Sequence, residues 1–212
     1  MYYQNVFRQP VRKITVVGNG QVAVEPDIAT IQFEVRTVDE QVRVAQEENA
    51  AIMNQVIQSF VQLGIPRANI QTVSYTIYPK YDYVDGEQVF RGYEVNNAIS
   101  VKLTNIDQVG IVIDTAVANG ANRVSSIQFS VEDPSMYEQE AIVAALQDAQ
   151  TKAQTIANSM QLAVPPQPIR IVEEVNRVSP TPYYSVAAEK STTPIEKGQL
   201  VITATMRVDY SF

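Results

Sequence analysis

A short sequence motif occurs twice in this chain. Ile31-Gln32-Phe33-Glu34-Val35 returns as Ile127-Gln128-Phe129-Ser130-Val131. Each copy alternates apolar and polar residues, which is typical of a strand with one buried face. Each copy also leads into a long helical pattern and then into two further strand patterns. Because internal self-similarity constrains the whole fold, we expect two strand–helix–strand–strand units, one over about 28–104 and one over about 123–212, with the motifs in corresponding places.

The first unit is expected to begin with a strand from Ile28 to Val38. A helical pattern follows, for which Asp39 is the expected N-cap and Gly64 the expected C′ residue. Two strands, at 70–78 and 93–104, complete the unit. A long hairpin connection over 79–92, which contains Asp85-Gly86, joins them.

A short helix over 107–119 is expected to link the two units. The helix of the second unit begins at Asp133-Pro134, where a capping residue precedes a proline. Small residues recur along it and allow close approach to a neighbouring element: Ala141, Ala145, Ala149, Ala153 and Ala157. Strands over 169–178 and 200–212 complete this unit, around a proline-rich loop over 176–198. These patterns predict an α+β fold in which antiparallel sheets pack against two long helices.

Residues 1–13 are expected to form a loose N-terminal arm, and 14–212 a domain that contains both units. A strand starts at Ile14, and Gly18-Asn19-Gly20 is expected to interrupt it, because glycine in a strand pattern indicates a bulge or bend. A phosphate-binding loop would need a third glycine and a helix start just after it. The strand residues Val22-Ala23-Val24 follow instead, which disfavours phosphate binding.

The composition excludes several classes of site. The chain has no cysteine and no histidine, which excludes disulfides, thiol nucleophiles, Ser-His-Asp triads and nearly all zinc sites. Its formal net charge is −7, and it lacks the Lys/Arg cluster that nucleic-acid-binding proteins usually carry. We therefore expect no nucleic-acid partner, no cofactor, no metal and no catalytic residues.

The segment from Met1 to Lys13 has no apolar region typical of a secretory signal, and no apolar run approaches the ~20 residues of a membrane span. The sequence as written therefore predicts a cytoplasmic protein without a membrane span. A mature form whose signal had been removed would look the same.

Two groups of carboxylates could carry chemistry. The pairs Glu47-Glu48 and Glu173-Glu174 are sequence neighbours, whose side chains diverge on a helix or a strand, so a solvated surface is favoured over acid–base catalysis. The acidic residues at 82, 85 and 87 could hold calcium, but they lack the twelve-residue loop and its terminal glutamate. Turn formation is the favoured interpretation of these three.

Tyrosines gather around the first hairpin: Tyr75, Tyr78, Tyr81, Tyr83 and Tyr93. Tyrosine can stack on bases or sugars, but basic neighbours are lacking here. Because tyrosine is enriched in the cores of protein interfaces, we predict a protein–protein interface that uses Tyr78, Tyr81, Tyr83 and Tyr93.

Several stretches, taken in order, resemble the SIMPL domain family, which includes YggE-like oxidative stress defence proteins and a periplasmic immunogenic protein. The matching stretches are Gly18-Asn19-Gly20 through Ala29, Gly64-Ile65-Pro66, Asn69 to Thr72, Tyr78-Pro79-Lys80-Tyr81-Asp82, Gly92-Tyr93-Glu94-Val95, Asp114 through Asn122, Ile127-Gln128-Phe129 and the alanine-rich helix from Glu140 to Met160. No single stretch is specific, but the ordered set is.

The resemblance implies an α+β fold, no known enzymatic activity and no established catalytic residues. It also implies ring- or channel-like homo-oligomers, because one family member forms such an assembly, and a link to stress defence. Many members carry a signal peptide, so the resemblance implies a cell-envelope location as the alternative to the cytoplasm.

Two functions are compatible with these observations. The first is a non-enzymatic, self-assembling protein whose contacts use the hairpin from Tyr78 to Tyr93 or the loop over 176–198. The alternative is a small-molecule binder or enzyme with a pocket between the two repeats, since pockets favour such places.

Overall fold

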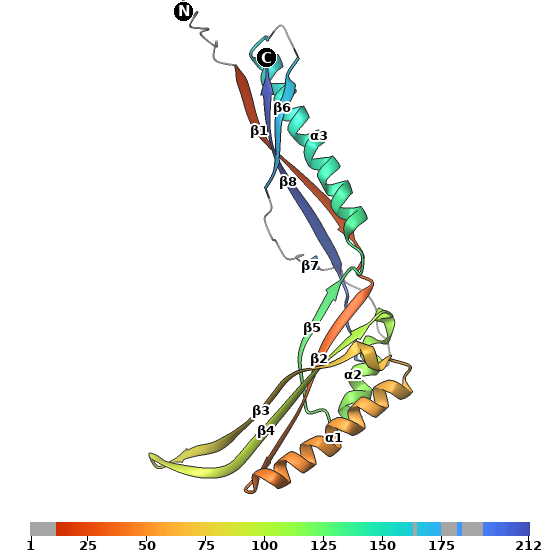
Figure 1. The fold of residues 1–212 in the computed structure, drawn as a ribbon, viewed down its shortest axis with the longest axis vertical. Helices are drawn as coiled ribbons and strands as arrows, with labels where there is room; N and C mark the ends of the chain where they lie inside the picture. The colour runs from red at the N-terminus through yellow and green to blue at the C-terminus, as the bar shows by residue number, and fades with distance from the viewer. Residues whose placement is uncertain (1–11, 163–164, 175–181, 184–192) are drawn as a thin grey trace, which may run out of the picture. The chain divides into compact units, whose positions relative to one another are not determined.

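The structure, a computed structural model, describes residues 12–162, 165–174, 182–183 and 193–212. The chain forms two compact units. Unit 1 is built from residues up to Val24 together with 133–183 and 199–212, and unit 2 from 25–132 and 184–198. Both units combine antiparallel strands with a long helix (Figure 1), which confirms the α+β fold.

Unit 2 contains a four-stranded antiparallel sheet with the order β3-β4-β2-β5. Its helices α1 and α2 pack together against one face of this sheet, where β2 and β4 lie. The elements are β2 (Ile28–Asp39), α1 (Val42–Gln62), the single turn η1 (Arg67–Asn69), β3 (Ile70–Val84), β4 (Glu87–Leu103), the single turn η2 (Ile106–Gln108), α2 (Val109–Ala118) and β5 (Arg123–Ser130).

The core of unit 2 follows from the period of two in β2. Ala29, Ile31, Phe33 and Val35 are fully buried under the helices, as their alternation predicts. The ring of Phe33 packs against that of Phe60 from α1, with 5.1 Å between the centroids. Long apolar side chains on the strand face and on the helix stripe therefore join the two layers.

The two repeated motifs do not lie in corresponding places of two units, contrary to expectation. β5 pairs with β2 in the antiparallel sense, so Ile127 lies opposite Ile31 in one sheet. Phe129 packs at the border of the core that contains Phe33. The proposed second repeat over 123–212 therefore does not form a separate unit, because its first strand belongs to unit 2.

A likeness of topology does exist, but with a different first strand. In unit 2 the chain runs β2, α1, β3, β4 and the strand order is β2-β4-β3. In unit 1 the chain runs β1, α3, β6 and β8, with the two-residue β7 before β8, and the strand order is β1-β8-β6. In unit 1, β1 takes the place that β2 has in unit 2.

Of the two ends of α1, only the C-terminal end is formed by the residue that the sequence predicts. Gln41 is the N-cap residue, and the expected cap, Asp39, is the last residue of β2, whose carboxylate accepts a hydrogen bond from the Gln41 amide at 2.8 Å. At the other end Gly64 has a φ of +87°, and the Ile65 amide donates to the Phe60 carbonyl at 3.1 Å. This is the glycine-terminated helix end that the sequence predicts.

Unit 1 places one helix against a sheet of the order β1-β8-β6, with β7 also paired to β8. Its long helix lies along the strands (Figure 1). The elements are β1 (Lys13–Val24), α3 (Ser135–Ser159), β6 (Gln167–Glu173), β7 (Pro182–Tyr183) and β8 (Gln199–Ser211). The N-cap residue of α3 is Pro134, and the Asp133 carboxylate accepts the Ser135 amide at 3.1 Å.

Gly18 and Gly20 do not interrupt β1, which pairs with β8 in unbroken register. They lie where α3 comes closest: a Cβ on Gly18 would be 2.0 Å from the Ala145 carbonyl oxygen, and one on Gly20 would be 1.9 Å from that of Ala141. The alanine stripe of α3 is buried against this surface. Glycine is needed here for space against the helix backbone, and no bend is present.

Most of the expected N-terminal arm (1–13) and much of the proline-rich loop (176–198) lie outside the described residues. Residues 193–198 are described and belong to unit 2, where polar contacts and the packing of Ile195 against the core hold them. Thr193 Oγ1 donates to Asp114 at 2.6 Å, and Lys197 forms an ion pair with Glu25 at 2.9 Å.

Candidate functional site

The β3–β4 hairpin closes with a two-residue turn and not with the long connection expected over 79–92. Asp85 and Gly86 have φ angles of 53° and 88°, the left-handed conformation that suits such a turn. Strand pairing continues to Val84 opposite Glu87. We name the outer part of this hairpin, 75–84 with 87–93, the aromatic ribbon.

The strand register places most of the aromatic side chains of the ribbon on one face. Residues 75, 77, 79, 81 and 83 alternate along β3 and share the face on which Val95 enters the core. Arg91 is an extra residue in β4, so Phe90 lies opposite Tyr81 and Tyr93 lies opposite Pro79. Ring centroids are 5.6 Å apart for Tyr81 and Phe90 and 5.4 Å apart for Phe90 and Tyr93, in edge-to-face arrangements.

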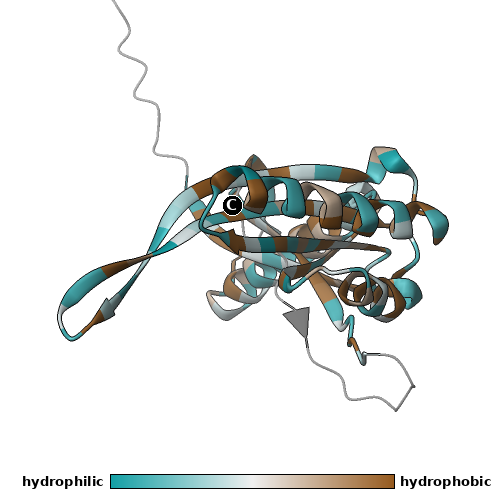
Figure 2. Cartoon of the chain, turned by 90° about the horizontal axis from the view of Figure 1, so that it is seen from below, coloured by the Kyte–Doolittle hydropathy of each residue, from teal (hydrophilic) through white to brown (hydrophobic). Residues whose placement is uncertain are grey.

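This aromatic face extends the core face of the sheet beyond the part that α1 covers. Its apolar side chains are between 39% and 76% exposed: Tyr75, Ile77, Tyr81, Tyr83 and Phe90. Figure 2 shows hydrophobic and hydrophilic bands along the projecting hairpin. Large contiguous areas of exposed apolar surface are rare on monomeric proteins and are a common feature of protein contact surfaces.

Two devices fix the base of the ribbon to β2. The Glu94 side chain, only 1% exposed, forms an ion pair with Arg36 at 2.7 Å and accepts a hydrogen bond from the Tyr78 hydroxyl. That hydrogen bond raises the pKa of Tyr78. Gly92, with φ +114°, lies against the backbone of Asp39, where a Cβ would come within 2.5 Å of the carbonyl oxygen. The three strands are thus held together where the ribbon begins.

The four tyrosines expected to form an interface are therefore divided between the two faces. Tyr81, Tyr83 and Tyr93 lie on the aromatic face, and Tyr78 lies on the opposite face with Glu94. Tyr75 and Ile77 share one strand face, as their alternation predicts. Phe90 was not expected beside Tyr81, because residues 79–92 were expected to form a long connection and not two paired strands.

The acidic residues of the hairpin form turn and strand contacts. Asp82 forms an ion pair with Arg91 at 2.9 Å, and Asp85 occupies the turn. Within the described part of the chain, no three acidic side chains converge on a point where they could hold a metal ion. The two sequential glutamate pairs also lie apart from any shared site: Glu47 pairs with Arg43 and Glu174 with Arg207.

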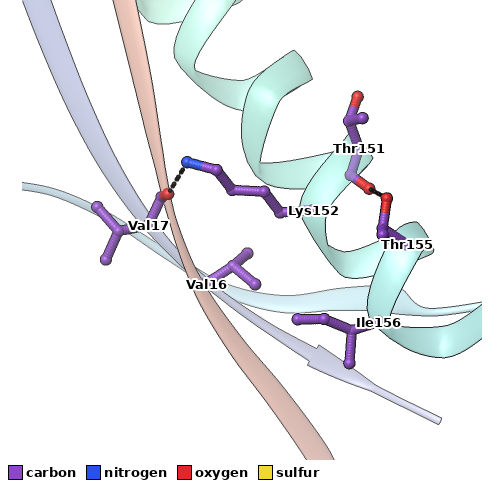
Figure 3. Close-up of a pocket in the computed structure, with 6 residues that line it drawn as sticks. All are labelled: Val16, Val17, Thr151, Lys152, Thr155 and Ile156. Atoms are coloured by element: carbon purple, nitrogen blue, oxygen red, sulfur yellow. Dashed lines mark hydrogen bonds between the residues drawn. The ribbon is translucent and has the colours of Figure 1, made fainter. Parts of the chain in front are cut away.

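A groove of ≈ 340 Å³ lies between β1 and α3 of unit 1. It is lined by Val16, Val17, Thr151, Lys152, Thr155 and Ile156 (Figure 3). The Lys152 ammonium donates to the Val17 carbonyl at 2.8 Å and to Asp148 at 2.7 Å. Its hydrogen-bonding capacity is therefore largely used within the unit, and the remaining surface of the groove is mostly apolar. None of the described helices has the length and apolar character that crossing a bilayer requires.

Comparison with known proteins gives relatives without an assigned activity. The chain is 30% identical over 154 residues to "Uncharacterized protein YggE" of Escherichia coli K12, over 72% of this chain and 62% of that protein. It is 28% identical over 207 residues to the "26 kDa periplasmic immunogenic protein" of Brucella melitensis, over 90% of this chain and 80% of that protein. The chain thus matches less than two thirds of the length of the E. coli relative.

The family comparison covers both units. The model of the SIMPL family, described as "Protein of unknown function (DUF541)", matches residues 14–210. The match runs from the first strand of unit 1 through the whole of unit 2 and back to the last strand of unit 1. The chain therefore belongs to the SIMPL family.

Proposed function

We propose that this protein is a non-enzymatic, self-assembling member of the SIMPL family whose main contact surface is the aromatic face of the ribbon. The observation that carries the proposal is the continuation of the core face of the sheet into Tyr75, Ile77, Tyr81, Tyr83 and Phe90, which no helix of the described residues covers. Burial of apolar area contributes roughly 25 cal/mol per Å², and tyrosine is enriched at the centre of interfaces.

The support at the base of the ribbon favours a preformed contact. The Glu94–Arg36 ion pair and the close fit of Gly92 on Asp39 fix the strands where the ribbon leaves the unit. Association costs less free energy when the contacting residues are already ordered. We therefore propose that the ribbon binds as a rigid element.

A second copy of the same chain is the proposed partner, in a closed ring- or channel-like homo-oligomer. Closed symmetry is the usual outcome for soluble homo-oligomers. The name of the Brucella relative places that protein in the periplasm, which favours a cell-envelope location for this chain over the cytoplasmic location expected from Met1–Lys13. A role in stress defence belongs to the same proposal and rests on the family resemblance.

The alternative function, a small-molecule binder or enzyme with a pocket between the repeats, has weaker support. The groove beside α3 is formed within unit 1. Its lysine is already bonded to Val17 and Asp148.

The test is the solution mass of the intact chain by light scattering. We expect a defined oligomer, and a mass near the 23.6 kDa of one chain would contradict the proposal. Substituting Tyr81→Ser and Tyr83→Ser should shift the mass toward smaller species with an unchanged circular dichroism spectrum. Tyr137→Ser, on α3 and outside the ribbon, is the matched control and should leave the mass unchanged.

A further inference from the structure

The outer edge of β1 is occupied by an ion pair from α3. β1 pairs with β8 on one side, and none of the described strands pairs with its other side. On that side the Val17 carbonyl accepts from Lys152 Nζ at 2.8 Å (Figure 3). The Asn19 amide donates to Asp148 Oδ2, also at 2.8 Å. The two side chains are joined to each other at 2.7 Å and lie one helical turn apart.

The Val17 carbonyl and the Asn19 amide are the two groups to which one residue of an added parallel strand would form its hydrogen bonds. In a parallel ladder, a residue donates its N–H to the carbonyl of one neighbour and accepts from the N–H of the residue two positions further on. Val17 and Asn19 present such a carbonyl and amide on either side of Gly18. Lys152 thus takes the place of the incoming donor, and Asp148 that of the incoming acceptor.

The strand at the other edge of the same sheet, β6, runs in the direction that a parallel addition to β1 requires. β1 and β6 are both antiparallel to β8, so they are parallel to each other. Among the described strands β6 pairs only with β8, and Ile169 and Ile171 are each 53% exposed. A second copy could therefore add its β6 to β1 and continue the sheet in the same sense.

Helix α3, which covers one face of this sheet, would not prevent the addition. Successive copies would be displaced by three strands, or roughly 14 Å at about 4.8 Å per strand. Packed helices need only about 8–10 Å between their axes, so one α3 would clear the next. Because the added strand leaves another β6 or β1 edge free, the contact does not close and growth has no natural limit.

We propose that the Asp148–Lys152 pair is an edge guard, which occupies the free backbone groups of β1 and so prevents β6 of a second copy from adding there. Unpaired strand edges are sites of aggregation, and native proteins protect them with charged side chains. The hydrogen bond from Lys152, with that from the Asn19 amide, lowers the pKa of Asp148, so its carboxylate stays charged and acceptor-only to a lower pH than that of an ordinary aspartate. This guard lies in unit 1 and is independent of the ribbon in unit 2.

The test removes the guard and measures size by sedimentation velocity over a wide range of protein concentration. We expect Asp148→Ala with Lys152→Ala to give species that grow with concentration without a plateau, with a weight-average mass at least about twice that of the unsubstituted protein. The matched control is Arg43→Ala with Glu47→Ala, which removes an exposed pair of the same spacing on α1. The control should sediment like the unsubstituted protein.

A third variant adds Ile169→Lys and Ile171→Lys to the unguarded protein, which places charges on β6. Restoration of the original mass would identify β6 as the partner edge. Growth that persists in this variant, or a folded unguarded protein whose mass is unchanged, would overturn the proposal. If the double substitution prevents folding, Lys152→Met keeps most of the side-chain stem against the sheet. Combined with Asp148→Leu, which leaves the Asn19 amide without its acceptor, that variant should still grow with concentration, and its failure to do so would overturn the proposal equally.

Discussion

Ile31 of β2 and Ile127 of β5 lie directly opposite each other in neighbouring antiparallel strands. The two Ile-Gln-Phe motifs are therefore sheet partners that border one core. Their likeness reflects a shared requirement, since each strand presents apolar residues to the helices at every second position. Their depths differ, because Phe33 is fully buried against Phe60 whereas Phe129 packs at the border of the core.

This difference predicts unequal costs of truncation. Phe33→Ala should lower the free energy of unfolding by about 3–5 kcal/mol, the usual result for a fully buried phenylalanine. Phe129→Ala should cost less, because part of its ring remains in contact with water. Urea titration of both variants, monitored by circular dichroism, measures the two values. Equal losses would contradict the placement of these residues in one core at different depths.

The fit of β1 on α3 predicts that Gly18→Ala is strongly destabilising. The new methyl group would meet the Ala145 carbonyl oxygen, a backbone atom that cannot rotate away, and overpacking of this kind costs about 1–3 kcal/mol or more. Gln21→Ala, at an exposed position of the same strand, should change stability by less than about 0.5 kcal/mol. Thermal unfolding of both variants is the measurement, and a Gly18→Ala protein as stable as the control would show that α3 can move away at little cost.

The buried Glu94 carboxylate at the base of the ribbon is expected to couple β2 and β4 energetically through its ion pair with Arg36. Glu94→Gln removes the charge that faces Arg36 but keeps an acceptor for the Tyr78 hydroxyl. Because Arg36 is partly exposed and can turn to water, we expect a loss of about 1–2 kcal/mol, below the 3–5 kcal/mol of a fully buried pair.

A double-mutant cycle with Arg36→Ala measures this interaction. The coupling energy should fall within about 0.5–3 kcal/mol, the range for residues in one network. Additive effects of the two substitutions would show that the ion pair does not stabilise the base of the ribbon.

Asp209 is expected to account for part of the loss of stability of unit 1 at low pH. Its carboxylate accepts from Thr15 Oγ1 at 2.7 Å and lies 3.5 Å from the Lys13 ammonium. The hydrogen bond from Thr15, with the charge of Lys13, lowers the pKa of Asp209. A carboxyl whose pKa is lowered on folding stabilises the protein above its ordinary pKa of about 3.9, and the stabilisation is lost as the pH falls through the lower, folded-state value.

The measurement is the free energy of unfolding between about pH 6 and pH 2. It should fall with pH in the unsubstituted protein and fall less steeply in Asp209→Asn. The pKa values of Asp148 and Asp133 are also lowered, so the variant should keep some dependence on pH. Parallel curves for the two proteins would refute a contribution from Asp209.

Local patterns in the sequence predicted the long helices, the buried face of β2 and the small-residue stripe of α3, but not the length of the β3–β4 hairpin. Period two predicted which face of β2 is buried, and the spacing of Ala141 to Ala157 predicted close approach of the helix. The sequence also predicted the end of α1 at Gly64 and the resemblance to the SIMPL family, because each depends on residue types in a fixed local order. The tyrosine-rich hairpin could be named as a surface, but Tyr78 could not be separated from Tyr81 without the register.

Strand partners were decided by tertiary structure alone. The sequence could not show that β5 returns to β2, or that β1 takes the matching place in unit 1, since hydrogen-bonded ladders join residues that are far apart in the chain. The same holds for Gly18 and for the Asp148–Lys152 pair, whose meaning depends on a helix backbone and a strand edge that meet only after folding. Amino-acid order determined which faces are apolar, and the packing of those faces in three dimensions determined which strands and side chains meet.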